Sequence, residues 1–495
     1  MAERRRTAGP RSAAARRQGV PRPRAARGRQ APAADARARA ARAAVRDLSA
    51  RGVVAVACCF VDNAGVTRLM SVPLRRFEEA VRHGVGMSSL FSVFLVNDAI
   101  VAAPGFEGPS GDFRLVPDPE AAVAVEPMPG WAFAPVDVFD QEGEVFPACP
   151  RSFLKRQVEA LARRGISVRA AFELEFFLGR RAGLPPGIGE EGDPVPAHLG
   201  PGYSPQVLTP HAGFATDLLQ ALEAQGIGFH KFHPEYSVGQ FELSFPARDP
   251  VAAADAVVLV RQTIRAAAAR HGLDASFAPV VFAGAVGNGC HLHFSLWDRR
   301  GRNLFAGGDG PEGMTRTAEA FAAGVLAQLP ALVAITCPSV PSYLRLRPHL
   351  WSGAHACWGR ENREAALRFI AGSVGERAVA ANMELKPVDG AGNPYLVLGS
   401  VLAAGAEGLA RELRLPEPTT EDPAAIPSAR ARRMGLRRLP GSLAEAVAEL
   451  ERSEVLRGAM GEVLFGAFLA TRRGEIEAFA EMDEEAVVRA HRWRY

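Results

Sequence analysis

The amino-acid sequence predicts a fold of mixed helices and strands, α/β or α+β, in which the polar faces of several strands converge. The first observation is that helix-like segments ending near a glycine are each followed by a strand-like run. The second is that four strand-like stretches carry carboxylates or imidazoles at alternate positions, and alternate strand residues share a face. Helices are predicted over residues 153–164, 216–224 and 250–271, and strands over 168–178, 227–245 (a pair) and 275–282.

Residues 1–44 form an Ala- and Arg-rich extension without aromatic residues. The first 42 residues contain 13 Arg against only Glu3 and Asp35, a charge of +11, so the rest of the chain carries +4 minus +11, or −7. Such an extension cannot bury much apolar area, and we expect it to be disordered. Because the body is mildly acidic, a general affinity for nucleic acid is not expected. A basic arm for nucleic acid or membrane and a dispensable extension are both open interpretations of residues 1–44.

Residues 45–149 are predicted to form a small β-rich domain, and residues 150–495 a larger one. In the larger part helices and strands alternate, residues 181–213 are Pro/Gly-rich and predict a long surface loop, and the residues from Ser442 onward predict helices. In the small domain, apolar strand-like runs at 53–61, 91–96 and 121–125 are separated by turn residues.

The cysteines and the apolar segments favour a cytoplasmic protein. None of the six cysteines has CxxC spacing, which predicts reduced thiols. No apolar stretch follows the N-terminal arginines, so we expect no signal peptide. The longest uncharged run, between Glu319 and Arg345, is interrupted by prolines, which argues against a membrane span.

Carboxylates and imidazoles are concentrated in the four polar strand-like segments. Each pair alone is a weak signal, because amphipathic strands often place acids toward solvent. Five carboxylates and two imidazoles brought together would repel unless cations lay among them, so the set predicts a two-metal site and phosphate chemistry. An oxygen-rich set favours Mg²⁺ or Mn²⁺ over zinc. The residues are Glu173, Glu175, Glu235, Glu242, His291, His293 and Glu384.

A cluster of arginines and aromatic residues at 343–368 offers partners for phosphate, since Arg can bind carboxylates and phosphates bidentately. The alternative interpretation is a solvated face of an Arg-rich protein. Only three lysines exist, and two of them, Lys231 and Lys386, lie within the polar strand-like segments. No Walker loop is present, and the glycines at 284–289 precede a strand, unlike a dinucleotide-binding fingerprint.

At these residues the sequence resembles the glutamine synthetase family over nearly all of residues 50–495. The matching motifs, in order, are the Glu-x-Glu strand, His-Pro-Glu-Tyr-Ser-Val-Gly-Gln-Phe-Glu (233–242), Gly-Asn-Gly-Cys-His-Leu-His (287–293), Ser-Tyr-Leu-Arg-Leu-Arg-Pro (342–348) and Asn-Pro-Tyr-Leu (393–396). The resemblance implies an N-terminal β-grasp domain, a catalytic domain with a funnel of β-strands flanked by helices, and a homo-oligomer of stacked hexameric rings, a dodecamer, with active sites between neighbouring subunits.

The resemblance also implies roles for individual residues. Cofactors would be ATP and two Mg²⁺ or Mn²⁺ ions. Arg345 would hold the glutamate carboxylate and, with Arg363, act in catalysis; Gly287, Trp351 and Lys386 would line the substrate site. His293, Arg363, Arg368 and Lys386 would lie at the nucleotide phosphates. One metal would be held by Glu175, Glu235 and Glu242, and the other by Glu173, His291 and Glu384.

The amine side of the site departs from the family pattern. In glutamine synthetases an acid six residues after the active-site arginine helps to bind and deprotonate ammonium, and here that position is Trp351. The family's Asp-Gly-Ser-Ser segment is matched only by Gly-Met-Ser-Ser at 86–89, which has no acid. Lys386 stands where the family has an arginine, and no tyrosine lies between Tyr395 and Tyr495, so we expect no adenylylation control.

These departures resemble the γ-glutamyl amide-forming branches of the family. The favoured hypothesis is an ATP-dependent ligase that joins the γ-carboxyl of glutamate to an organic amine through an acyl phosphate. The alternatives are an ordinary glutamine synthetase that uses ammonium, a catalytically silent family member, and a nucleic-acid role for the N-terminal arm.

Overall fold

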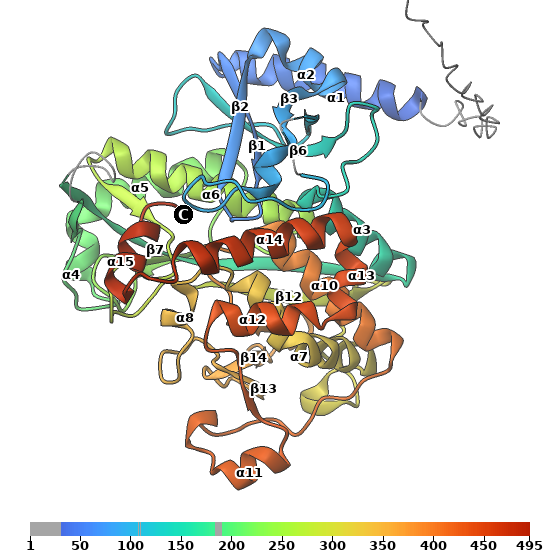
Figure 1. The fold of residues 1–495 in the computed structure, drawn as a ribbon, viewed down its shortest axis with the longest axis vertical. Helices are drawn as coiled ribbons and strands as arrows, with labels where there is room; N and C mark the ends of the chain where they lie inside the picture. The colour runs from blue at the N-terminus through green and yellow to red at the C-terminus, as the bar shows by residue number, and fades with distance from the viewer. Residues whose placement is uncertain (1–30, 107, 109, 184–190) are drawn as a thin grey trace, which may run out of the picture.

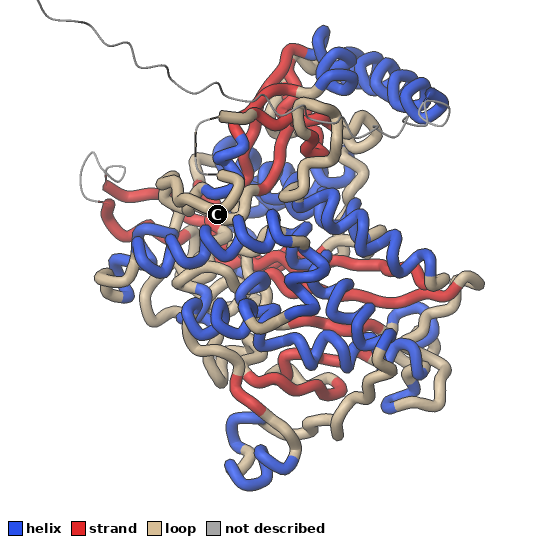
Figure 2. Tube along the Cα trace, turned by 45° about the vertical axis from the view of Figure 1, so that its right-hand side comes forward, coloured by secondary structure: helices blue, strands red, loops and turns tan. Residues whose placement is uncertain are grey.

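The structure is a computed structural model that describes residues 31–106, 108, 110–183 and 191–495 (Figure 1). A six-stranded sheet lies at one end of the molecule, and a ten-stranded sheet forms the larger body. Helices lie across the larger sheet (Figure 2). The predicted α+β fold class is confirmed.

The smaller sheet has the strand order β2-β1-β6-β4-β3, with β5 paired to β6. Strands β1 and β6 are parallel, whereas β1 and β2 are antiparallel. The elements are α1 (Ala31–Ala50), β1 (Ala55–Val61), β2 (Thr67–Pro73), η1 (Leu74–Arg76), α2 (Phe77–His83), β3 (Val85–Ser88), η2 (Ser89–Val93), β4 (Asp112–Pro117), β5 (Val123–Ala124) and β6 (Trp131–Phe139).

The larger sheet has the order β16-β13-β14-β15-β12-β7-β10-β9, with β8 and β11 also paired to β7. Its strands are β7 (Ile166–Gly183), β8 (Glu191–Pro196), β9 (Lys231–Pro234), β10 (Gln240–Ser244), β11 (Asp274–Ser276), β12 (Cys290–Asp298), β13 (His355–Arg360), β14 (Ala365–Ile370), β15 (Asn382–Leu385) and β16 (Arg437–Arg438). The helices are α3 (Pro150–Arg163), α4 (Pro205–Leu208), α5 (Ala212–Ala224), α6 (Pro250–Arg270), α7 (Arg316–Thr336), α8 (Ser342–Arg345), α9 (Arg377–Ala380), α10 (Pro394–Ala410), α11 (Ser428–Arg433), α12 (Leu443–Glu451), α13 (Glu454–Met460), α14 (Glu462–Ala478) and α15 (Glu484–His491).

Strand β7 crosses the centre of the larger sheet and separates a core face from a polar face. Phe172, Leu174 and Phe176 are buried, whereas Glu173 and Glu175 point to the opposite face. Helices α3 and α6 pack against β7. The apolar face therefore fixes which way the acidic residues point.

Ion pairs join the two parts of the chain. Arg151, at the start of α3 and 4% exposed, pairs with Asp118 at 2.8 Å and Asp137 at 3.2 Å, and with Asp255 of α6 at 2.8 Å. A buried guanidinium is tolerated because carboxylates surround it.

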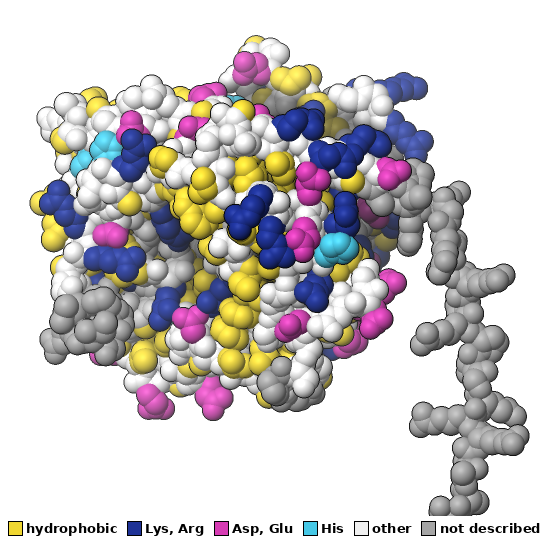
Figure 3. Space-filling view, turned by 90° about the horizontal axis from the view of Figure 1, so that it is seen from above, with side chains coloured by type: hydrophobic (Ala, Val, Ile, Leu, Met, Phe, Trp, Pro, Cys, Tyr) yellow, Lys and Arg dark blue, Asp and Glu magenta, His cyan; other side chains and the backbone are white. Residues whose placement is uncertain are grey.

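Seen from the end that carries the smaller sheet, Lys and Arg side chains are interspersed with acidic and apolar ones (Figure 3).

Three of the predicted helices are present with small shifts of their ends, as α3, α5 and α6, and the C-terminal residues from Leu443 are helical as predicted. All six cysteines are buried and free, in agreement with the predicted thiols. Helix α7 is long and apolar enough to cross a membrane, but 78% of its apolar window is buried inside the protein, as in a core helix.

Several local predictions differ from the structure. The extension predicted to be disordered to residue 44 is helical from Ala31, because its alanines favour helix and Ala41 is buried; residues 1–30 lie outside the described residues. The strand predicted at 91–96 is wrong, since a 3₁₀-helix ends at Val93. The strand predicted over 275–282 is only Asp274–Ser276.

The segment predicted to be a surface loop at 181–213 also holds regular structure. Its described residues include the end of β7, all of β8 and the short helix α4, and residues 184–190 lie outside the described residues. Strand β8 pairs with β7, so edge pairing overrides the Pro/Gly-rich composition.

Replacing Leu174, which is 0% exposed, by alanine should lower the free energy of unfolding by about 2–5 kcal/mol, because the cavity it leaves lies at the centre of β7. Thermal and urea unfolding of the variant measure the loss. The matched control is Val54→Ala at a 68% exposed position, which should change stability by less than about 0.5 kcal/mol. Equal stability of the two variants would contradict the assigned core.

Candidate active site

The register of the larger sheet brings the predicted acidic and imidazole residues onto one face. Across β7 and β10, Glu175 lies directly opposite Glu242, and across β7 and β12, Glu173 lies opposite His291. Like charges directly opposite each other destabilise a sheet unless a cation compensates them. The pairing of Glu175 with Glu242 therefore fits a site for metal ions.

The same face continues over the strands on both sides. His293 on β12 is opposite Glu384 on β15, and Glu384 is opposite Arg368 on β14. On the other side, Glu242 on β10 is opposite His233 on β9. Six neighbouring strands thus supply the polar side chains.

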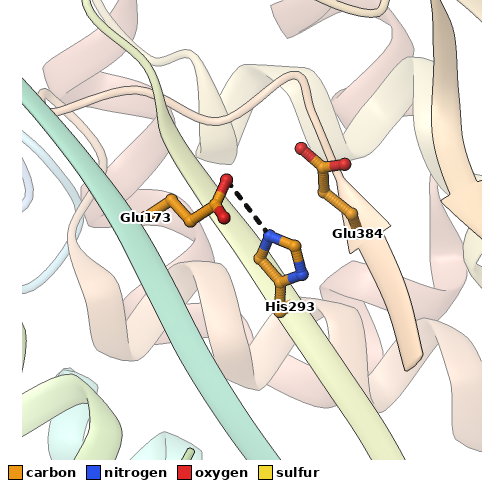
Figure 4. Close-up of side chains that lie close together, drawn as sticks. All are labelled: Glu173, His293 and Glu384. Atoms are coloured by element: carbon orange, nitrogen blue, oxygen red, sulfur yellow. Dashed lines mark ion pairs between the residues drawn. The ribbon is translucent and has the colours of Figure 1, made fainter. Parts of the chain in front are cut away.

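The first cluster consists of Glu173, His293 and Glu384, whose ligand atoms lie within 4.8 Å of one another (Figure 4). Nε2 of His293 is 3.4 Å from Glu173. His291 also reaches this cluster, since its Nδ1 is 3.7 Å from Glu173 and 3.4 Å from Glu384. Both imidazoles are therefore placed to share the two carboxylates.

Neighbouring histidine and lysine side chains keep the carboxylates of this cluster ionised. Burial alone would raise the pKa of Glu173, but hydrogen bonds from His291 and His293 bring it well below its usual range. Burial opposes ionisation of Glu384 too, yet Lys386 and the two histidines lower its pKa to about 2. Burial would lower the pKa of His293, but Glu173 and Glu384 raise it to about 9. The carboxylates thus favour the protonated form of His293. A bound metal ion would supply positive charge in place of that proton.

The second cluster consists of His233, Glu235 and Glu242, again within 4.8 Å of one another. Nε2 of His233 lies 3.3 Å from Glu242, and the Tyr203 hydroxyl donates to Glu235. Burial, together with Glu175 and Glu242, raises the pKa of Glu235, although Tyr203 opposes this. Glu242 raises the pKa of His233. A divalent cation would relieve the repulsion between these carboxylates.

A glycine-rich loop supports Glu175 between the two clusters. Oε2 of Glu175 accepts hydrogen bonds from the Gly289 amide at 2.7 Å and from Gln240 Nε2 at 3.1 Å. Gly287 cannot carry a side chain, because a Cβ there would lie 2.1 Å from the carbonyl oxygen of Pro279. The loop therefore packs tightly against the Pro279 backbone, and its Gly289 amide reaches Glu175.

Arg345 is 4% exposed and lies at the C-terminal end of α8. Its Nη2 contacts His291 Nε2 at 3.0 Å, but its Nη1 is buried and makes no hydrogen bond among the described residues. A buried guanidinium nitrogen without a partner fits an anionic ligand such as a carboxylate.

Arg368 and Lys386 both pair with Glu384, at 3.1 Å each. Arg368 also pairs with Glu361 at 2.7 Å. Lys386 is 3% exposed, so its charge is turned into the site. These two cations adjoin the first cluster, and their role in phosphate binding stays a prediction.

Arg363 lies against Trp351 in the structure. The Arg363 guanidinium lies over the Trp351 ring, 5.8 Å from its centroid. No ion pair joins Arg363 to the acids of either cluster within the described part of the chain. Trp351 is 58% exposed.

Sequence reasoning missed several residues at the site. His233 precedes Glu235 by two positions, so the alternation that identified Glu173 and Glu175 would have identified it as well. Tyr203 comes from the segment predicted to be a loop, and no local pattern marked it. Gln240, which binds Glu175, Gly287 and Asn288, was likewise not assigned a role.

Comparison with known families matches both parts of the chain. A model described as the catalytic domain of glutamine synthetase matches residues 147–491, and one described as the glutamine synthetase N-terminal domain matches residues 40–143. The chain belongs to the glutamine synthetase family. Membership of the family confirms the predicted enzyme class. Enzymes of this family generally use ATP and divalent metal ions, and the two Mg²⁺ or Mn²⁺ ions of this chain stay a prediction.

Relatives match over nearly their full length. Gamma-glutamylpolyamine synthetase GlnA3 of Streptomyces coelicolor is 50% identical, covering 91% of this chain and 95% of its own. The glutamine synthetase of Halobacterium salinarum is 32% identical, covering 88% and 92%. A crystal structure of a novel glutamine synthase homolog superposes with a TM-score of 0.78 at 36% identity, covering 90% and 99%, and a GmaS/ADP complex with 0.76 at 29%, covering 89% and 96%.

Replacing Glu242 by glutamine should weaken Mn²⁺ binding at the second cluster about tenfold or more, because a carboxylate ligand becomes a neutral amide. Electron paramagnetic resonance titration of free Mn²⁺ measures the change. The control, Glu481→Gln on the surface, should bind as the wild type does. Unchanged Mn²⁺ binding by the Glu242 variant would contradict the assignment of this cluster as a metal site.

Proposed function

We propose that the protein is an ATP-dependent ligase that phosphorylates the γ-carboxylate of glutamate and couples it to an organic amine. The observation that carries the proposal is a complete set of acidic and imidazole residues on one sheet face beside an amine side that has lost its acid. The 50% identity to a gamma-glutamylpolyamine synthetase supports an amine in preference to ammonium.

We assign the two metal ions, Mg²⁺ or Mn²⁺, to two sets of residues that overlap the two clusters. Glu173, His291 and Glu384 hold one, and Glu175, Glu235 and Glu242 the other; His293 and His233 adjoin them. Bound metals neutralise crowded phosphate and carboxylate oxygens and align them for transfer. These residues would hold the two ions close together at the polar face of the sheet.

Arg345 is proposed to bind the glutamate carboxylate through its unpartnered Nη1, next to the backbone of Gly287. Lys386 keeps a positive charge at the same wall of the site. His293, Arg363 and Arg368 are proposed to face the ATP phosphates, where Arg363 and Arg345 stabilise the charge that develops during transfer. Arg363 must leave the Trp351 ring to do so.

The amine then attacks the acyl phosphate and expels phosphate. Trp351 offers an exposed indole to the amine's carbon chain and a π-face to its charge, an attraction worth about 0.5–2 kcal/mol. Ammonium has no carbon chain to use such a surface. An aromatic side chain in place of an acid thus favours organic amines.

Two alternatives remain to be tested. An ordinary glutamine synthetase would prefer ammonium to every organic amine. A silent family member would bind no nucleotide, but all six residues assigned to metals are present; five lie on one sheet face and Glu235 lies near Glu242, which counts against silence.

The assembly and location extend the proposal. We propose a homo-oligomer of hexameric rings, a cytoplasmic location supported by the six free thiols, and two folding units at 45–149 and 150–495. No role in nucleic-acid binding is assigned to the body of the chain.

With ATP, Mg²⁺ and glutamate, a panel of diamines, polyamines, ethanolamine and ammonium should give phosphate release that is fastest with an organic amine. The physical reason is the loss of an ammonium-binding acid at position 351. Mass spectrometry of the γ-glutamyl amide identifies the product. Ammonium exceeding every amine would overturn the proposal.

Restoring an acid by Trp351→Glu should shift the ratio of kcat/KM for ammonium to that for the amine upward by about tenfold, because a carboxylate attracts ammonium and the indole surface is lost. Trp351→Phe is the matched control, since it keeps a π-face without adding charge, and it should leave the ratio within a few-fold of the wild type. An unchanged ratio in the Glu variant would remove Trp351 from the amine side.

A further inference from the structure

The acid missing at position 351 has a neighbour that can replace it. Trp351 lies in the loop between α8 and β13, and Glu364 lies in the turn between β13 and β14. The Trp351 amide donates a hydrogen bond to Glu364 Oε1 at 3.1 Å. A carboxylate therefore lies directly against the backbone of the residue at which the family's ammonium-binding acid is absent.

The Glu364 carboxylate has no basic partner of its own. Among residues 31–106, 108, 110–183 and 191–495, no Lys, Arg or His lies within ion-pair distance of it, although Arg368 and Lys386 nearby are both paired with acids. Glu364 is half-buried. A partly buried carboxylate with one backbone donor keeps capacity for a charged donor.

The loop that presents Trp351 is held in an unusual conformation. Trp351 has φ 52° and His349 has φ 66°, a region that bulky residues seldom adopt and that often marks functional sites. Gly353 fixes the loop to the sheet, because a Cβ there would lie 2.9 Å from Ala366 Cα and 3.1 Å from Lys386 Cβ. The loop thus brings the Trp351 backbone to Glu364 and Gly353 close to Lys386.

The indole already accepts a cation in the structure, since the Arg363 guanidinium lies 5.8 Å from its centroid. Under the proposed function Arg363 turns to the phosphates, which frees the ring. A positively charged group on the freed ring would then lie on the residue whose backbone amide holds the Glu364 carboxylate.

We propose that Glu364 is an amine-binding, specificity-determining residue that holds the ammonium group of an alkylamine against the Trp351 ring. This inference rests on the proposed function. The ligand class is an alkylammonium cation, recognised by one carboxylate and one aromatic face. Glu364 thus supplies from the β13–β14 turn the charge that position 351 lacks.

The test compares Glu364→Gln with the wild type in the full-length enzyme. Glutamine keeps an oxygen that accepts the Trp351 amide, so the loop stays in place, and only the negative charge is removed. Two nucleophiles are used with ATP, Mg²⁺ and glutamate: an alkylamine from the panel, which is cationic at neutral pH, and hydroxylamine, which is neutral there and traps the acyl phosphate as a hydroxamate.

We expect KM for the alkylamine to rise about tenfold to a hundredfold, as for loss of a hydrogen bond to a charged group, with KM for glutamate unchanged. Hydroxamate formation should fall far less, which shows that the variant is folded and still activates glutamate. The control, Glu481→Gln, removes an exposed acid outside the β13–β14 turn and should behave as the wild type with both nucleophiles.

The outcomes separate this inference from the proposed function. If the wild type couples alkylamines but Glu364→Gln changes the alkylamine and hydroxylamine reactions by the same factor, Glu364 has no part in amine binding and only this inference is overturned. If the wild type couples no alkylamine, the proposed function and this inference both fall. A selective loss of the alkylamine reaction supports both.

Discussion

Carboxylates that face one another across neighbouring β-strands are the constraint on which the site depends. Glu175 opposite Glu242, and Glu173 and Glu384 on either side of β12, are held there by strand register. A slip of one residue would turn these acids into the core and the phenylalanines of β7 outward, so apolar burial fixes the acidic face. These carboxylates repel one another because they are close together and shielded from water. Divalent cations would relieve that repulsion, so the face is suited to binding them.

Alternation of polar and apolar residues within one segment was enough to predict the two faces of a strand. Glu173 and Glu175 beside Phe172, Leu174 and Phe176 define both faces of β7 from the order of residues alone. Groupings of distant segments, such as His291 with Glu384, have no local signal and came only from ordered motifs. The wrong predictions have a similar origin. The strand predicted at 91–96 and the disorder predicted to residue 44 were inferred from composition, whereas packing and helix propensity determine the structure there.

The contact between Trp351 and Glu364 shows the limit of comparing a sequence with a motif position by position. Along the chain, position 351 has exchanged a charge for an indole, and the matched motif holds no acid on the amine side. In the folded chain a turn thirteen residues on brings a carboxylate to the same backbone amide. A charge can thus be lost from a motif and present in the site, because sheet connections bring separate loops together.

The two halves of the proposed reaction draw on different parts of the fold. Activation of the acid uses side chains in the middle of paired strands, where register, core packing and ion pairs leave little freedom. The choice of amine uses the loop after α8 and the β13–β14 turn, which can exchange side chains without moving a strand. Because the acyl phosphate is chemically the same whichever amine attacks it, changes in these loops alter the nucleophile and leave the phosphoryl transfer intact. A strained, glycine-anchored loop is where such a change is expected, since its backbone fixes the side chain's position whatever that side chain is.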